Sequence, residues 1–159
     1  MTLRDTIIYT ANACLGTKEG SGRHQTIIDI YNQYPGKNRG YKITLLDPWC
    51  AAFVSAVFIA SGLADLIPIE CSCFYMKNEG SKRGRIRDPK RYIPKKGDLI
   101  FYRWAGKNVV SHVGIIEDVH GSALTVIEGN YQDSVGKRRI KLSYQYIDSY
   151  YEVDYGGSD

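Results

Sequence analysis

The sequence has no apolar run long enough to span a bilayer. The longest one, residues 51–60, is shorter than the roughly 20 residues that a membrane helix needs, so it predicts a buried helix. The N-terminus also lacks the apolar segment of a signal peptide, and we expect synthesis in the cytoplasm without a leader. Without internal repeats or low-complexity tracts, the chain is expected to form one domain over residues 1–155, with 156–159 as a tail or the start of a linker.

Histidine and cysteine are scarce, with three and four residues respectively. A zinc site needs several such ligands at a characteristic spacing, so we expect neither a metal nor another cofactor. Cys71 and Cys73 are too close in sequence for an unstrained disulfide on a regular element, and Cys14 lies in an amphipathic stretch typical of a buried small hydrophobe. Reduced thiols are therefore expected.

The excess of positive charge is small, at +4, and much of it comes from one stretch. Its basic residues are Lys82, Arg83, Arg85, Arg87, Lys90, Arg91, Lys95 and Lys96. Such a run is usually a solvated loop, although a clustered positive field also attracts anionic polymers. Because no nucleic-acid-binding motif accompanies it, we expect no nucleic-acid partner.

The hydrophobic pattern changes period half-way along the chain. Helical spacing occurs at about 2–15, 21–34, 49–61 and 72–79, with Gly16, Gly62 and Gly80 as expected helix ends. Strand-like segments follow at 98–103, 111–119, 123–129, 137–143 and 147–153. Helices followed by a run of strands predict an α+β fold with an antiparallel sheet.

Cys50 is expected in the first turn of the third helix, directly after Pro48 and Trp49. Unpaired N–H groups and the positive end of the helix dipole stabilise a thiolate at such a position. A histidine brought beside that sulfur can take its proton and later give it to a leaving amine, as in cysteine hydrolases of amide bonds. The alternative for Cys50 alone is a buried structural thiol.

The predicted sheet offers the partners for such a thiol. His112 begins one strand, and Glu128 and Asn130 end the next, across an expected hairpin loop at 120–122. Because side chains alternate between faces, pairing His112 opposite Asn130 would bring all three onto one face, whereas a slip of one residue would separate them. We predict the first register because the chemistry needs it. His24 and His120 are interpreted as loop or surface histidines.

Four motifs occur in order along the chain. They are Pro-Trp-Cys-Ala-Ala-Phe-Val-Ser at 48–55, Pro-Lys-Lys-Gly-Asp-Leu-Ile-Phe-Tyr at 94–102, Ser-His-Val-Gly-Ile-Ile-Glu at 111–117 and Ile-Glu-Gly-Asn at 127–130. With them the chain resembles the CHAP family of cysteine, histidine-dependent amidohydrolases and peptidases, within the papain-like NlpC/P60 superfamily. The resemblance covers nearly the whole chain and implies a papain-like α+β fold, with N-terminal helices packed on a C-terminal antiparallel sheet.

This resemblance implies hydrolysis of amide bonds in bacterial peptidoglycan. Cys50 would be the nucleophile, His112 the general base and then acid, and Glu128 and Asn130 the orienting groups, with the choice between these two left open. The residues expected to contact substrate are Trp49, Trp104, Tyr131 and Tyr41, and for Trp104 and Tyr131 a place at the edge of the core is an open alternative. Tyr41 is also a candidate oxyanion donor by analogy with relatives.

Several consequences of the resemblance stay open at this point. Some family members carry an aspartate-rich calcium loop before the cysteine, but residues 40–47 offer only Asp47, so calcium dependence is not expected. We expect a monomeric phage or prophage lysin that reaches the wall by a holin-type route, although a toxin delivered to competitors would have the same sequence features. The alternatives in function are a thiol acyltransferase and a non-catalytic wall-binding module, and the bond that is cut is undecided between amidase and endopeptidase.

Overall fold

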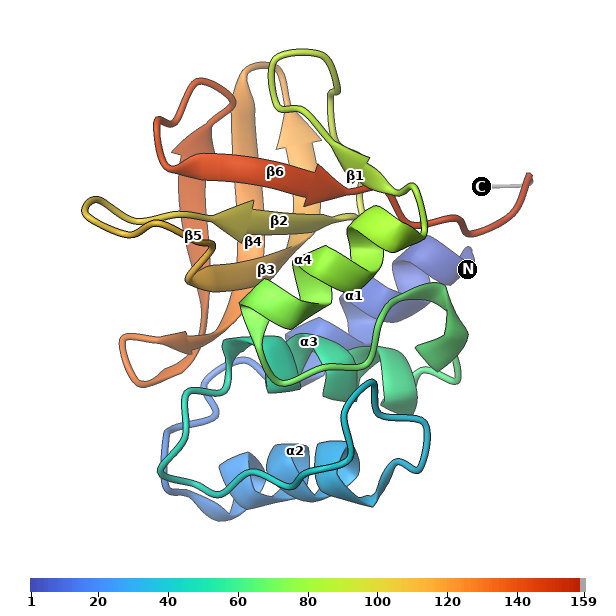
Figure 1. The fold of residues 1–159 in the computed structure, drawn as a ribbon, viewed down its shortest axis with the longest axis vertical. Helices are drawn as coiled ribbons and strands as arrows, with labels where there is room; N and C mark the ends of the chain where they lie inside the picture. The colour runs from blue at the N-terminus through green and yellow to red at the C-terminus, as the bar shows by residue number, and fades with distance from the viewer. Residues whose placement is uncertain (158–159) are drawn as a thin grey trace.

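Residues 1–157 are described by the computed structural model, and they form helices packed on one antiparallel sheet (Figure 1). The helices are α1 (Leu3–Ala13), α2 (Gly22–Gln33), α3 (Cys50–Ala60), the 3₁₀ helix η1 (Ala64–Leu66) and α4 (Cys73–Lys82). The strands are β1 (Ile86–Arg87), β2 (Leu99–Tyr102), β3 (His112–His120), β4 (Ala123–Tyr131), β5 (Ser134–Lys141) and β6 (Ile147–Tyr151). The predicted α+β class is confirmed. The expected tail at 156–159 lies partly outside the described residues.

The helix boundaries follow from local capping. Thr2 and Asp5 form a reciprocal capping box at the start of α1, and Ser21 accepts a hydrogen bond from the His24 backbone N–H at the start of α2. Gly62, with φ +73°, ends α3 as predicted. Within residues 1–157, no helix has the length and apolar character needed to cross a membrane.

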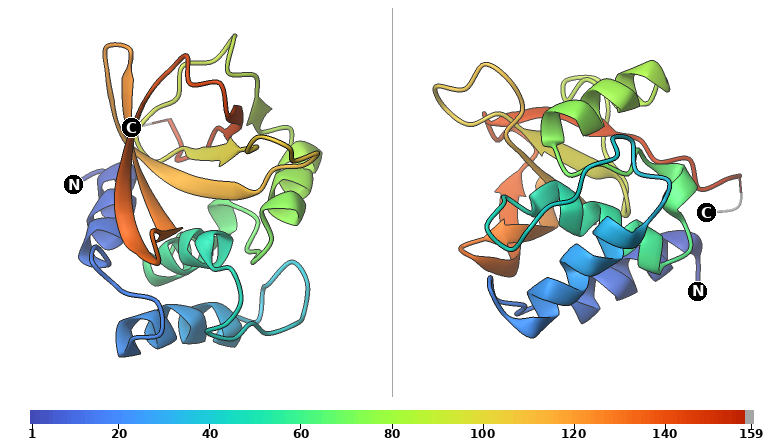
Figure 2. Two further views of the ribbon diagram at one scale, coloured as in Figure 1. Left: turned by 90° about the vertical axis from the view of Figure 1, so that its left-hand side faces the viewer. Right: turned by 60° about the horizontal axis from the view of Figure 1, so that its bottom comes forward.

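The sheet has the strand order β1-β6-β2-β3-β4-β5 and is antiparallel throughout. Figure 2 shows that it is strongly curved, with the helices on one side and α2 farthest from the strands. Helix α3 lies between α2 and strands β3 and β4, and residues 50–58 are all buried. A helix that is apolar on all sides needs such a central place, because every face must be covered.

Two local predictions about the helices and strands are wrong. Helix α4 does not end at Gly80, because this glycine lies inside the helix where a Cβ would come within 2.8 Å of the Tyr151 ring and 3.0 Å of Ile86 Cδ1. Close packing, not a left-handed turn, therefore explains the glycine; the turn comes at Gly84, with φ +71°. The two-residue strand β1 was missed because it lies within the basic stretch and has no alternating pattern.

Trp49 and His24 belong to the core. Trp49 is fully buried, and its Nε1 donates a hydrogen bond to Glu19 Oε1 at 3.0 Å, so its contacts in this structure are those of a core residue and its contact with substrate stays a prediction. His24 is not on the surface: it is fully buried, its ring lies 4.2 Å from that of Trp49, and its Nδ1 accepts a hydrogen bond from the Gly20 N–H. Together they support the segment that leads into α3.

Candidate active site

His112 and Glu128 are brought together by the pairing of β3 with β4. Ile115 pairs with Ile127, which is the predicted register and sets Gly114 opposite Glu128. His112 Nε2 lies 2.8 Å from Glu128 Oε1, and both side chains are buried. A carboxylate only accepts hydrogen bonds, so Nε2 carries the hydrogen and Nδ1 is left for another partner.

Gly114 provides the space in which the Glu128 side chain lies. A Cβ at this position would come within 2.5 Å of Val126 Cγ1 and 2.8 Å of Glu128 Cγ. We expect Gly114→Ala to lower the free energy of unfolding by about 1–3 kcal/mol, measured by urea titration, because the strand has to shift. Gly22→Ala is the control, since its Cβ would meet nothing within 4 Å. Equal stability of the two variants would contradict this account.

Glu128 is held from its other side by Arg138 of β5. The Arg138 Nε donates to both carboxylate oxygens, at 3.0 Å each, while the guanidinium lies over the rings of Tyr131, Trp104 and Tyr102 at 4.8, 5.0 and 5.4 Å. Burying a carboxylate is costly unless it is paired and hydrogen-bonded, and Arg138 supplies both. The sequence analysis did not predict Arg138. This basic residue pairs with the buried Val126 of the neighbouring strand, and that pairing is the signal that could have identified it.

Cys50 is the first residue of α3, and only 6% of it is exposed. Trp49, the residue before it, makes no capping hydrogen bond with its side chain, so no capping side chain occupies the first N–H groups of α3. The Cys50 Sγ lies 3.4 Å from the Cys73 Sγ. The pKa of the Cys50 thiol is well below its ordinary value. The hydrogen bond with Cys73 lowers it most, burial opposes this effect, and the hydrogen bond with His112 and the charge of the imidazolium lower it further.

The His112 imidazole is tuned in the opposite direction. Burial favours the neutral ring, but hydrogen bonds with Cys50 and Glu128 and their negative charges outweigh it and raise the pKa of His112 to about 9. The three side chains thus favour a thiolate and imidazolium pair near neutral pH. This arrangement can form a nucleophile and hold the proton that a leaving group needs.

Asn130, the second orienting candidate, is placed differently. It lies at the irregularity of β4 with φ +54° and is half-buried. No hydrogen bond of its side chain occurs among the described residues. The contact with the imidazole, left open by the sequence, is therefore made by Glu128, and a role for Asn130 stays a prediction.

Comparison with protein-family models finds the CHAP domain over residues 37–130, which is more than half of the chain. The chain belongs to the CHAP family. The fold of this CHAP chain is similar to the crystal structure of Ly7917, with a TM-score of 0.53 and 14% identity over 96% of this chain and 63% of that one. The fold is also similar to the crystal structure of Ly7917 with the hydrolyzing product of MDP, with a TM-score of 0.53 and 15% sequence identity over 94% of this chain and 62% of that one. No curated protein matches.

These comparisons confirm the predicted family and the papain-like CHAP fold. Identities this low show the fold alone. The chain spans less than two thirds of the length of Ly7917. Within the described residues of this CHAP chain, no group of three or more histidine, cysteine, aspartate or glutamate side chains is arranged to hold a metal.

An open pocket of about 300 Å³ gives access to Cys50. Its lining includes Tyr41, Pro48, Cys73 and Phe74. The Tyr41 hydroxyl accepts a hydrogen bond from Arg39 Nη2 at 2.7 Å. This position agrees with the expected contact of Tyr41 with substrate, which stays a prediction.

Trp104 and Tyr131 lie beside the pair of His112 and Glu128, not in the lining of this pocket. The Trp104 ring stacks on Tyr102 at 4.9 Å and is 5.8 Å from the His112 ring, and Tyr131 packs on Arg138. Both are half-buried. The alternative of a packing role at the edge of the core therefore describes their contacts, and binding of substrate by either stays a prediction.

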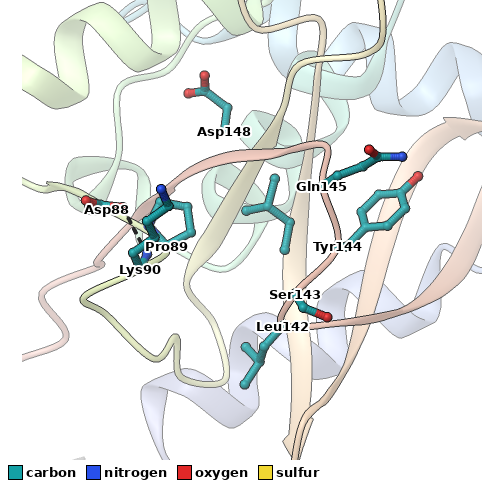
Figure 3. A pocket seen from close by; sticks show the side chains of 9 residues that line it. Asp88, Pro89, Lys90, Leu142, Ser143, Tyr144, Gln145 and Asp148 are labelled. Atoms are coloured by element: carbon teal, nitrogen blue, oxygen red, sulfur yellow. Dashed lines mark hydrogen bonds between the residues drawn. The ribbon is translucent and has the colours of Figure 1, made fainter.

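A second cavity, of about 360 Å³, lies between the segment 88–90 and the loop 142–148 (Figure 3). Its carboxylates already have partners. Asp88 accepts a hydrogen bond from the Lys90 N–H, drawn as a dashed line, and Asp148 pairs with Lys77 at 2.6 Å. With no nucleophile or base of the thiol site in its lining, this cavity does not take part in the chemistry described above.

Proposed function

We propose that this CHAP-family chain hydrolyses amide bonds of bacterial peptidoglycan with Cys50 as the nucleophile. The observation that carries the proposal is a thiol at a helix start, open to a pocket, whose pKa is lowered in part by His112, together with Glu128 and Arg138 bound in turn behind the imidazole. Family membership and the shared fold with Ly7917, solved with the hydrolyzing product of MDP, support it.

In the proposed reaction, the Cys50 thiolate attacks the carbonyl carbon of the scissile amide. The uncapped N–H groups at the start of α3, that of Cys50 first, stabilise the negative oxygen of the tetrahedral intermediate. The His112 imidazolium then gives its proton to the leaving amine. In the second half, neutral His112 takes a proton from water, and the hydroxide formed releases the acyl group from sulfur.

Glu128 and Arg138 act on this reaction through the imidazole. Glu128 binds Nε2 and so leaves Nδ1 for the thiol, and its charge stabilises the imidazolium. Arg138 touches neither the thiol nor the imidazole in the described contacts, and serves as a positioning residue that holds the Glu128 carboxylate in place.

The pH profile of the reaction should show the ion pair. Because the pKa of His112 is raised to about 9 and that of Cys50 is lowered, the thiolate and imidazolium form should exist over a broad range around neutrality. We expect kcat/KM to fall as pH rises through about 9, where the leaving-group proton is lost. Turbidity loss of cell-wall suspensions in buffers from acid to alkaline pH measures this. A basic limb near the ordinary histidine pKa would contradict the ion pair.

The test of function is digestion of purified peptidoglycans with several types of cross-link. Mass spectrometry of the fragments and labelling of new amino termini, for the wild type and Cys50→Ala, identify the bond. New termini with the wild type alone, in water, support the hydrolase and decide between amidase and endopeptidase. A product that forms only with an added amine acceptor would indicate a thiol acyltransferase. Binding without products in either protein would indicate a non-catalytic module.

A further inference from the structure

Two thiols, not one, stand at the centre of the site. Cys50 begins α3 and Cys73 begins α4, so two helix N-termini meet at the pair of sulfur atoms, which are 3.4 Å apart. Both cysteines are free and almost completely buried, at 6% and 8% exposure. Both nevertheless belong to the lining of the 300 Å³ pocket, so a small solute in the pocket reaches them.

The loop that carries Cys73 is fixed by a buried carboxylate. Glu70 accepts hydrogen bonds from Arg39 Nε and Nη2 at 2.9 and 2.7 Å, and from the backbone N–H groups of Cys71 and Ser72 at 2.9 and 3.1 Å. The Ser55 hydroxyl of α3 bonds both backbone groups of Glu70, at 2.8 and 3.0 Å. The framework that places Cys73 is thus anchored to the helix that carries Cys50.

The two thiols differ in protonation. The Cys50 neighbour and burial raise the pKa of Cys73 well above its ordinary value, so that it stays a thiol beside the Cys50 thiolate. Thiolates react with peroxides, and a neighbouring thiol resolves the product. Of the remaining cysteines, Cys71 also lines the pocket but its thiol faces Glu70 Oε1 at 3.6 Å, and the Cys14 thiol faces the Thr10 carbonyl oxygen at 3.5 Å.

We propose that Cys50 and Cys73 are an oxidisable pair, in which a peroxide drives formation of a disulfide that stops hydrolysis and that added thiols reverse. The inhibition rests on the proposed function, but the disulfide itself does not. In the first step the Cys50 sulfur gives two electrons to the peroxide, takes one oxygen and becomes a sulfenic acid, and the peroxide leaves as an alcohol or water. In the second, the Cys73 sulfur bonds to the Cys50 sulfur, the S–O bond breaks, and the oxygen leaves as water with the thiol hydrogen.

Closing the disulfide requires only a small movement, because the sulfur atoms have to approach from 3.4 Å to about 2 Å. Once bonded, Cys50 can no longer attack a carbonyl. The disulfide also protects the nucleophile, since a sulfenic acid without a resolving thiol is oxidised further to irreversible sulfinic and sulfonic acids. Cys73 therefore decides whether oxidation of this site is reversible.

The experiment treats the reduced full chain with hydrogen peroxide and maps the products by mass spectrometry. Residues 43–76 contain no lysine or arginine, so trypsin would leave three cysteines in one peptide, and cleavage after Glu70 is needed to separate Cys50 from Cys71 and Cys73. We expect the two peptides to be joined, with a mass lower by two hydrogens, in the wild type and in Cys71→Ser. Absence of this cross-link, or its loss in Cys71→Ser, would overturn the proposal.

Recovery of activity is the second readout. After peroxide, dithiothreitol should restore most of the hydrolysis by the wild type and by Cys71→Ser, whereas Cys73→Ser should gain two or three oxygens at Cys50 and stay inactive. Full recovery of Cys73→Ser would overturn the proposal. Should that variant not fold, the cross-link map of the wild type still decides. A chain that forms the cross-link but digests no peptidoglycan would contradict the proposed function and leave the thiol pair established.

Discussion

Cys50→Ala is expected to lower the rate of peptidoglycan hydrolysis by roughly 10⁴-fold or more, because the acyl intermediate of the proposed reaction forms on the Cys50 sulfur. The oxyanion-stabilising N–H groups and the bound substrate remain, so binding to the wall should be retained. The measurement is the rate of release of labelled amino termini at saturating peptidoglycan, with binding followed by sedimentation with the insoluble wall.

The matched control for Cys50→Ala is Cys14→Ala. Cys14 caps the C-terminal end of α1, and its thiol contacts the Thr10 carbonyl oxygen and not the site. Its replacement should leave the rate within about twofold, since surface and partly buried changes away from a site have small effects. A rate for Cys50→Ala comparable with that of Cys14→Ala would exclude the thiol mechanism.

Arg138→Met should have the next largest effect, on both stability and rate. Removing the guanidinium takes away the hydrogen bonds that hold the fully buried Glu128 carboxylate from β5, and breaking such a buried pair costs about 3–5 kcal/mol of the free energy of unfolding. A carboxylate that Arg138 no longer holds in place orients the imidazole less well, so we expect kcat to fall by roughly 10²-fold.

The pH profile separates this positioning role from a merely structural one. In Arg138→Met the decrease of kcat/KM at alkaline pH should begin below its wild-type position near pH 9, because a carboxylate that is no longer held against Nε2 stabilises the imidazolium less. Arg138→Lys should restore part of the rate, since it returns the charge without the guanidinium geometry. Arg139→Met, on the neighbouring position of β5, is the control. If Arg138→Met lost stability but its kcat/KM still fell at the same alkaline pH as that of the wild type, Arg138 would have a structural role only.

The resemblance of four short motifs to a family allowed much of this site to be predicted before the structure was considered. Helix starts at Thr2, Ser21 and Cys50 and the turn at Gly121 depend on residues within about four positions of one another, so local sequence is enough to predict them. The register of β3 with β4 was predicted as well, but only because the chemistry needs His112, Glu128 and Asn130 on one face.

The sequence by itself therefore determined the four α-helices and the five longer strands, their order, and the placement of a thiol at a helix start and a histidine at a strand start. Only the tertiary structure decided which distant side chains share the site. In the structure, the partner of His112 is Glu128 and not Asn130. Trp49 is buried, Arg138 binds Glu128, and Cys73 lies beside Cys50. The physical reason is that such contacts depend on how packed elements approach one another across the core, and no spacing along the chain encodes that approach.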